Sequence, residues 1–138
     1  MISYQDHLDG VTPERLTGFW SGWPSPPTPE LHMRILEGSE AVVLATDALA
    51  GDRVVGFITA VGDGVLASYI PLLEVLPDYR GRGIGTELVR RLLERLRDRY
   101  MIDLVCDEDL VPFYERFGLT RYGAMIERKP DVLKATTG

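Results

Sequence analysis

The sequence predicts a single α/β (α+β) domain, with a mixed, strongly twisted sheet of about six or seven strands and about four helices. Two observations lead to this fold class. Several short apolar runs are rich in β-branched residues, and the longest of them is followed by an amphipathic stripe. The chain has 138 residues, which is the length of one domain, so we expect residues 1–138 to form a single unit.

The N-terminal part of the chain predicts a strand, a short helix, a proline-rich loop and a second helix. Thr12 before Pro13, and Thr28 before Pro29, each have the pattern of an N-cap followed by proline in the first helical turn. Residues 20–29 are too rich in proline for a helix interior or a central strand, and they hold both tryptophans. Two interpretations remain for these tryptophans: a lid on the core, or a wall that faces a substrate.

Three apolar runs in the middle of the chain predict strands. The runs cover residues 41–45, 53–61 and 66–76, and glycine-containing turns separate them. The third run is largely apolar, as expected for a strand covered on both faces. Pro71 lies inside it and cannot donate a ladder hydrogen bond, so we expect a bulge or a locally free edge there.

A regular apolar stripe then predicts an amphipathic helix. The stripe consists of Ile84, Leu88, Val89, Leu92, Leu93 and Leu96. Beyond this helix we expect a strand over residues 101–106, a helix over 110–117 closed by Gly118, and a last strand within 119–128. The tail from residue 130 is expected to be frayed.

Composition excludes several classes of protein. The chain has 15 Lys and Arg against 21 Asp and Glu, a net charge of -6, whereas a general nucleic-acid binder should be basic. Cys106 is its single cysteine, so no intramolecular disulfide can form and a zinc site with two cysteine ligands is excluded. We therefore expect no nucleic-acid partner and no metal.

The sequence also predicts a protein that does not enter a membrane. Its first seven residues lack the basic and apolar regions of a signal peptide. Its longest apolar stretch, residues 65–76, is interrupted by polar residues and is far shorter than the ~20 residues of a membrane span. The free thiol and the acidic composition fit a cytoplasmic protein.

Three glycines at a spacing of two stand between the third apolar run and the amphipathic helix: Gly81, Gly83 and Gly85. The first turn of a helix leaves about four backbone N–H groups unpaired at its positive end, and glycines let an anion approach them. Arg80 and Arg82 add guanidinium groups that suit phosphate. The pattern predicts a phosphate or pyrophosphate site, although a turn that needs only glycine dihedral angles would contain the same glycines.

The spacing matches neither the Gly-Lys-Ser/Thr phosphate loop nor the dinucleotide-binding fingerprint. It resembles the acyl-CoA-binding signature of the Gcn5-related N-acetyltransferase (GNAT) family, through Leu73-x-Val75-x-Pro77 followed by Arg80-x-x-Gly83-x-Gly85. The predicted order of strands and helices is also similar to that family along most of the chain. The resemblance implies the acyl-CoA N-acyltransferase fold and one N-acetyltransferase domain.

The resemblance further implies acetyl-CoA as the donor co-substrate, with no metal. Its pyrophosphate would lie on the turn formed by Arg80, Gly81, Arg82, Gly83, Gly85 and Thr86. Its pantetheine arm would follow the main chain from Leu73 to Val75, where a bulge separates two parallel strands. The bulge expected at Pro71 is an independent reason for such a separation.

A second stretch resembles the family in Phe113-Tyr114-Glu115-x-x-Gly118. Leu119 stands where an aromatic residue is common, and Asp107 stands where the family usually has an asparagine that caps this helix near CoA. The resemblance implies that Phe113 and Asp107 lie near the donor. It also implies that Tyr114 is the catalytic acid, because a phenol beside the departing sulfur can donate a proton.

Glu74 is our candidate for the general base, since it is a carboxylate inside an apolar strand beside the expected separation. Pairing with an arginine or exposure to solvent would explain it equally simply. Asp107, Glu108 and a water relay are alternatives. Cys106 is expected to be a buried strand residue rather than a nucleophile, and Tyr69 either lines the acceptor pocket or packs in the core.

The predicted function is transfer of an acetyl group from acetyl-CoA to a primary amine by direct attack in a ternary complex. Two alternatives remain: a non-catalytic module that binds or senses acyl-CoA, and a nucleotide binder that uses the glycine turn. The acceptor would be a small amine or a peptide amine, and acidic residues 107–109 favour a cationic one. The final strand and tail could pair in a homodimer.

Overall fold

A central mixed sheet organises the molecule. The computed structural model describes residues 1–137, with side chains as far as residue 133. In this part of the chain the sheet has five strands in the order β1–β2–β3–β4–β5. They are β1 (Ile2–Gln5), β2 (Ala41–Asp47), β3 (Arg53–Gly62), β4 (Ala67–Val75) and β5 (Met101–Leu104). Strands β1 to β4 are antiparallel neighbours and β5 runs parallel to β4, so the predicted mixed sheet is confirmed with fewer strands.

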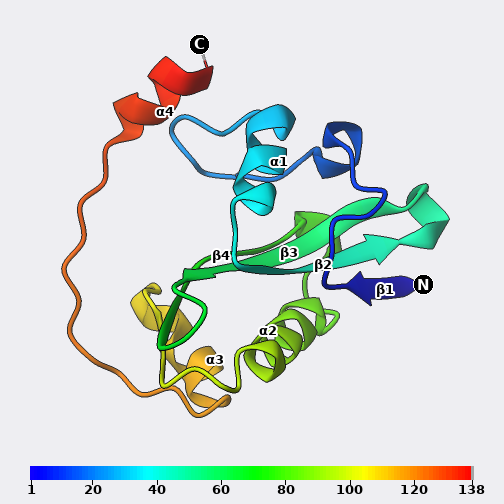
Figure 1. Cartoon of the computed structure of the whole chain (residues 1–138). Coiled ribbons are helices and arrows are strands. Elements are labelled where there is room, and N and C mark those ends of the chain that lie inside the picture. The colour runs from blue at the N-terminus through cyan, green and yellow to red at the C-terminus, as the bar shows by residue number, and fades with distance from the viewer. Residues whose placement is uncertain (138) are drawn as a thin grey trace.

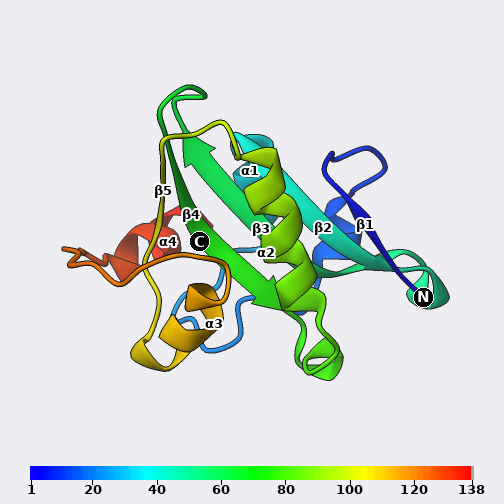
Figure 2. The same ribbon diagram turned by 90° about the horizontal axis from the view of Figure 1, so that it is seen from below.

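Helices cover both faces of this sheet (Figure 1). The 3₁₀ turn η1 (Pro13–Leu16) and α1 (Pro29–Glu37) lie on one face, and α2 (Ile84–Arg95) and α3 (Val111–Glu115) lie on the other. Viewed from that second face, α2 crosses the sheet and α3 lies beside β5 (Figure 2). The two proline-initiated helices and the amphipathic helix therefore form where the sequence predicts them.

The apolar stripe of α2 packs directly against the sheet. Its residues Ile84, Leu88 and Leu92 are buried, and each such side chain contributes about 1.5–3 kcal/mol relative to exposure. Gly56 on β3 lets the helix come close, because a Cβ at Gly56 would lie 3.1 Å from the Cδ1 atom of Leu88. Every residue of β2 is buried, which explains why residues 41–45 are apolar without alternation.

The opposite face of the sheet carries an aromatic cluster beneath α1. His32 on α1 is fully buried, with its ring centroid 4.4 Å from that of Phe57 on β3 and 4.9 Å from that of Trp20. Trp20 is buried as well, whereas Trp23 is partly exposed. Trp20 therefore covers the core, which is the first of the two interpretations of the tryptophans.

The expected bulge is present in β4 at Pro71. The flanking pairs are Thr59 with Leu72 and Val61 with Tyr69, with a register shift between them. β4 therefore has one residue more than β3 in this interval. Pairing between β4 and β5 stops at Ile70. Beyond that residue β4 has no strand partner on its β5 side in the described chain, and the two parallel strands separate.

The C-terminal part differs from the prediction. Residues 119–129 form no strand, because no neighbouring strand pairs with their backbone, and this accounts for the smaller number of strands. A helix, α4 (Pro130–Thr137), stands where we expected a frayed tail. The helix predicted over 110–117 is shorter than expected, because α3 ends at Glu115, and the 3₁₀ turn η4 (Glu108–Leu110) precedes it. Pro112 lies in the first turn of α3, where its missing N–H group breaks no helical hydrogen bond.

Among residues 1–137, every helix is too short or too polar to cross a lipid bilayer.

Candidate active site

The glycine turn connects β4 to α2 through the 3₁₀ turn η3 (Pro77–Tyr79). Gly81 and Gly83 have φ angles of 77° and 79°, which residues with a side chain rarely adopt. Gly83 is the N-cap of α2, and a Cβ at either glycine would meet no atom within 4 Å. The space beside these two glycines, at the positive end of α2, is therefore open.

Two arginines brace this turn and remain exposed. The Nε atom of Arg80 donates to the carbonyl oxygen of Val75 at 3.1 Å, and the Nη2 atom of Arg82 donates to the carbonyl oxygen of Asp78 at 3.0 Å. A guanidinium has five N–H groups, so most of them remain available to an anion. The predicted combination of glycines, helix start and arginines is thus brought together at one surface.

A contact that the sequence does not reveal holds the turn to the sheet. The hydroxyl of Tyr79 donates to the Oδ2 atom of Asp47 at the end of β2, over 2.6 Å. Asp47 also accepts a hydrogen bond from the amide of Leu49 at 2.9 Å. These two bonds hold the pKa of the Asp47 carboxyl below its usual range. We infer that the Tyr79–Asp47 bond positions the glycine turn.

The two halves of the signature lie side by side. Leu73 and Val75 are half-buried on β4 beyond the bulge. A Cβ at Gly85 would lie 3.9 Å from the Cγ2 atom of Val75, so the first turn of α2, which also contains Thr86, stands next to the end of β4. The unpaired edge of β4 therefore leads to the glycine turn.

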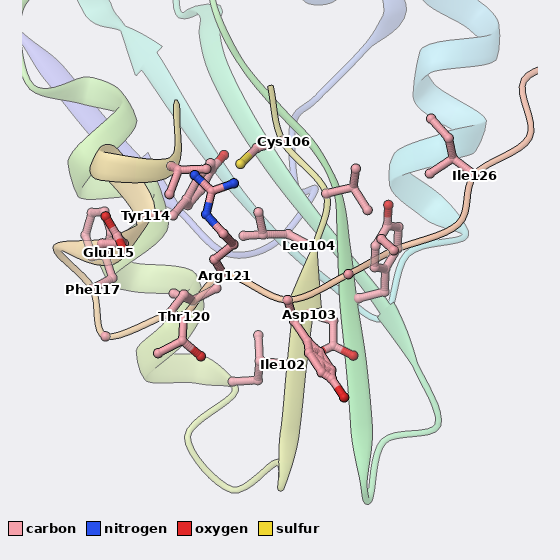
Figure 3. A pocket seen from close by; sticks show the side chains of 18 of the residues that line it. Ile102, Asp103, Leu104, Cys106, Tyr114, Glu115, Phe117, Thr120, Arg121 and Ile126 are labelled. Carbon is pink, nitrogen blue, oxygen red and sulfur yellow. The ribbon is translucent and has the colours of Figure 1, made fainter. Parts of the chain in front are cut away.

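A cavity of about 1140 Å³ lies between β5, α3 and the segment that follows α3 (Figure 3). Tyr69 on β4, Cys106 after β5 and Tyr114 on α3 line it together. Figure 3 shows Cys106 and Tyr114 on the same side of this cavity. Glu74 is not among the lining residues. The two candidate catalytic residues are therefore not brought into one cavity.

Tyr114 is 9% exposed and packs against Phe113, with ring centroids 4.9 Å apart. Burial raises the pKa of Tyr114 to about 12, with a further contribution from the Cys106 thiol. Within residues 1–137 its hydroxyl has no hydrogen-bond partner. The phenol is consequently neutral at physiological pH and free to donate a proton.

Cys106 and Asp107, which precede η4, show no feature of a catalytic group. Burial and the nearby acidic residues Asp107 and Glu108 raise the pKa of the Cys106 thiol, which keeps it in its weakly nucleophilic form. Asp107 is the N-cap of η4, but its side chain makes no capping hydrogen bond. No three His, Cys, Asp or Glu side chains in the described part of the chain gather as metal ligands would.

Glu74 faces α1 rather than α2, because it pairs with Phe57 while its neighbour Val75 pairs with Gly56. Its carboxylate accepts the backbone N–H of Trp20, with distances of 2.9 and 3.1 Å to the two oxygens. Trp20 has a φ of 74°, a strained conformation for a residue with a side chain. The Glu74 bond helps to hold that strained backbone in place.

Burial raises the pKa of the Glu74 carboxyl, and the amides of Trp20 and Ser21 together with Arg80 partly offset this effect. Neither of the simple alternatives suggested by the sequence, an arginine ion pair or full exposure to solvent, describes this residue. Glu74 and Trp20 are 54 positions apart in the sequence, so their contact can be seen only in the folded structure.

The fold and the glycine turn define an acyltransferase of the GNAT type. Residues 8–119 match the model of the acetyltransferase (GNAT) family, so the chain belongs to that family. It is similar to a solved protein from Deinococcus radiodurans R1 that was assigned as an acetyltransferase. That structure is 52% identical with a TM-score of 0.90, and the match covers 94% of this chain and 90% of the other.

Two further relatives agree with this family. A GNAT acetyltransferase structure from Streptococcus pneumoniae is 30% identical with a TM-score of 0.74, over 94% of this chain and 98% of the other. N-alpha-acetyltransferase 30 of Schizosaccharomyces pombe is 32% identical over 54% of this chain. The chain spans only 56% of the length of that protein, and 59% of the N-acetyltransferase ycf52 of Pyropia yezoensis.

Proposed function

We propose that this protein is an acetyl-CoA-dependent N-acetyltransferase that acetylates a primary amine by direct attack in a ternary complex. The observation that carries the proposal is the open glycine turn at the start of α2, next to the unpaired edge of β4. Composition and the single free cysteine favour a cytoplasmic site of action.

Open space at two glycines and the two exposed arginines of the turn support acetyl-CoA as the donor. The turn of Arg80, Gly81, Arg82, Gly83, Gly85 and Thr86 would bind the pyrophosphate, and the main chain from Leu73 to Val75 would bind the pantetheine arm. Backbone amides and guanidinium groups are the donors that a pyrophosphate needs. Asp107 and Phe113 would border the same donor. When bound, acetyl-CoA supplies an activated thioester, so no metal is needed.

Tyr114 would act as the general acid. Its neutral phenol would donate a proton to the sulfur as the thiolate departs, and the raised pKa keeps that proton on the residue until then. Tyr114 lines the cavity, and its hydroxyl has no hydrogen-bond partner in the described part of the chain, which supports this role because its proton is available to a molecule bound there.

Glu74 would act as the general base, directly or through water, and remove a proton from the incoming ammonium. The carboxyl pKa, raised by burial, brings the group closer to neutral pH than an exposed glutamate. Glu74 lies outside the Tyr114 cavity, so this role requires the amine to approach from the α1 face. The alternative role is purely structural, as the anchor of Trp20.

The acceptor would be a small amine or a peptide amine. The exposed acidic residues Asp107 and Asp109 favour a cation near the cavity. The similarity to a protein named N-alpha-acetyltransferase 30 adds a peptide N-terminus to the candidates.

A screen for release of free CoA thiol tests this proposal. Purified protein is incubated with acetyl-CoA and, separately, with polyamines, free lysine, aminoglycosides and peptides with free N-termini. We expect thiol release that depends on one amine class. Tight binding of acetyl-CoA without release for any amine would instead support the second candidate, a module that senses acyl-CoA without turnover.

A further inference from the structure

An arginine-rich groove lies between β1 and α2, on the face of the sheet that α2 covers. Figure 2 views this face, with β1 at the edge of the sheet. The groove has a volume of about 530 Å³, and four of the 15 basic residues of this acidic chain line it: Arg90, Arg91, Arg95 and Arg97. Arg91 lies eight residues beyond Gly83, or about 12 Å along the helix. The groove is therefore separate from the glycine turn.

Two of the arginines share one carboxylate. The Oε2 atom of Glu87 lies 2.5 Å from the Nη2 atom of Arg90 and 2.6 Å from the Nε atom of Arg91. A single negative charge does not neutralise two guanidinium groups. An excess of positive charge therefore remains at this point of the groove.

The other two arginines each have a carboxylate of their own. The Nη1 atom of Arg95 lies 3.0 Å from both the Oδ2 atom and the carbonyl oxygen of Asp6, which follows β1. The Nη1 atom of Arg97 lies 2.6 Å from the Oε1 atom of Glu94. In the described chain each of these arginines uses only Nη1, so its remaining N–H groups can bind another anion. A side chain that is already held in place also loses less conformational entropy when it binds.

The other wall of the groove is the edge strand of the sheet. β1 pairs with β2 alone, so its outer edge has no strand partner within residues 1–137. An unpaired edge can accept an extended peptide, whose main chain adds to the sheet while its alternate side chains face the same side. The groove therefore combines a place for a peptide backbone with a row of cationic side chains.

We propose that this groove is a docking site for an extended acidic segment of another protein. The segment would pair with the free edge of β1 and place alternate Asp or Glu side chains on the arginines of α2. Alternate residues of a strand are about 7 Å apart, and Arg91 and Arg95 are separated by about 6 Å along the helix. Guanidinium and carboxylate groups also match in geometry, because they can form two parallel hydrogen bonds.

The surroundings of the groove favour a peptide over other anions. The net charge of -6 opposes a long nucleic acid, whose phosphates would also meet the acidic remainder of the surface. The four arginine side chains are 42% to 68% exposed, so solvent would weaken their hold on a single small anion. A peptide with several carboxylates adds these weak contacts together and gains main-chain hydrogen bonds with β1 as well.

Docking at this groove does not depend on acetyl transfer, and its test needs no acetyl-CoA. A failure of the peptide test would leave the proposed activity untouched, and the reverse also holds.

Fluorescence anisotropy on the full chain tests the proposal with a labelled eight-residue peptide of alternating Glu and Thr. We expect this peptide to bind at least tenfold more tightly than the matched peptide of alternating Gln and Thr. With the Glu peptide at saturation, the amides of β1 that do not pair with β2 should exchange their hydrogens at least tenfold more slowly.

A pair of double variants separates the groove from the total charge of the protein. Arg91→Gln/Arg95→Gln should weaken binding of the Glu peptide at least tenfold, while its far-ultraviolet circular dichroism stays unchanged. The control Arg34→Gln/Arg128→Gln removes two exposed arginines elsewhere on the surface, and it should bind the peptide like wild type.

Four results would overturn the proposal. Equal affinity for the Glu and Gln peptides would show that carboxylates are not recognised. Equal losses in the two double variants would assign the binding to total charge. Tighter binding of an eight-nucleotide single-stranded RNA would make the groove a nucleic-acid site. Binding of the Glu peptide without slower exchange in β1 would show that no strand is added.

Discussion

At the scale of single residues, Tyr114 is the side chain on which the proposed chemistry depends most directly. It combines burial, a raised pKa and a hydroxyl without a partner in residues 1–137. Cys106, beside it, has none of the features of a nucleophile, because burial and acidic neighbours raise the pKa of its thiol.

Replacement of Tyr114 by phenylalanine removes only the hydroxyl. We expect Tyr114→Phe to lower kcat at least tenfold, because the departing thiolate loses its proton donor, with little change in the Kd of acetyl-CoA. Steady-state kinetics and calorimetric titration measure the two quantities. Tyr4→Phe is a matched control, since Tyr4 lies on β1 at the other edge of the sheet. Unchanged turnover in Tyr114→Phe would remove this residue from the mechanism.

Glu74 has two possible roles, and one substitution separates them. Glutamine keeps an oxygen that accepts the Trp20 N–H but cannot take a proton, so Glu74→Gln should fold normally and lose about 10²-fold in kcat. The acid limb of the pH–rate profile should disappear in the variant, because the ionisation that limits the base is gone. Near-normal kcat with an unchanged acid limb would assign Glu74 to the anchoring of Trp20 alone.

At the scale of elements, the glycine turn and the β4 bulge make up the proposed donor site. Both follow from local chemistry: three glycines before an amphipathic stripe, and a proline inside an apolar strand. This is why the sequence alone predicts them. The Tyr79–Asp47 and Trp20–Glu74 bonds join residues 32 and 54 positions apart, and no local pattern contains such contacts.

The glycine turn can be tested with two equivalent substitutions. Gly83 and Gly51 have φ angles of 79° and 68°, and a Cβ at either meets no atom within 4 Å. Alanine at each position should therefore cost about 1 kcal/mol of stability through backbone strain. Only Gly83→Ala should raise the Kd of acetyl-CoA, by at least tenfold, since Gly83 is the N-cap of α2 and its methyl group would occupy the open space proposed for the pyrophosphate. Equal affinities for acetyl-CoA in calorimetry would show that the donor does not bind at this turn.

The C-terminal elements show the limit of sequence reasoning. Residues 119–128 have the composition of a strand, but a strand also needs an edge to pair with, and the chain's own β5 does not supply it. The lack of a non-local partner therefore decides the outcome for this segment.

At the scale of the whole molecule, the buried His32 couples stability to pH. Burial lowers its pKa from 6.5 to about 4, and neither ring nitrogen has a hydrogen-bond partner in the described chain. Between these two pH values the unfolded chain binds a proton that the folded chain excludes. The free energy of unfolding therefore falls as the pH is lowered through this window, by roughly 3 kcal/mol from this residue.

Urea denaturation of wild type and variants from pH 7.5 to pH 4 measures this effect. His32→Leu should have a markedly flatter dependence of unfolding free energy on pH, whatever its stability at pH 7.5. His7→Gln should retain the wild-type slope, because His7 is the other histidine of the chain and lies exposed near the N-terminus. Parallel slopes for wild type and His32→Leu would contradict the buried, neutral state of His32.

The central claim is that this member of the GNAT family moves an acetyl group from acetyl-CoA to an amine. Mass spectrometry of the acceptor, combined with a count of the CoA released, tests it most directly. We predict that an amine found in the thiol screen gains one acetyl group on nitrogen for each CoA set free, and that neither product forms when the protein is omitted. Release of CoA without an acetylated amine, or no product from any amine although acetyl-CoA binds, would contradict the claim.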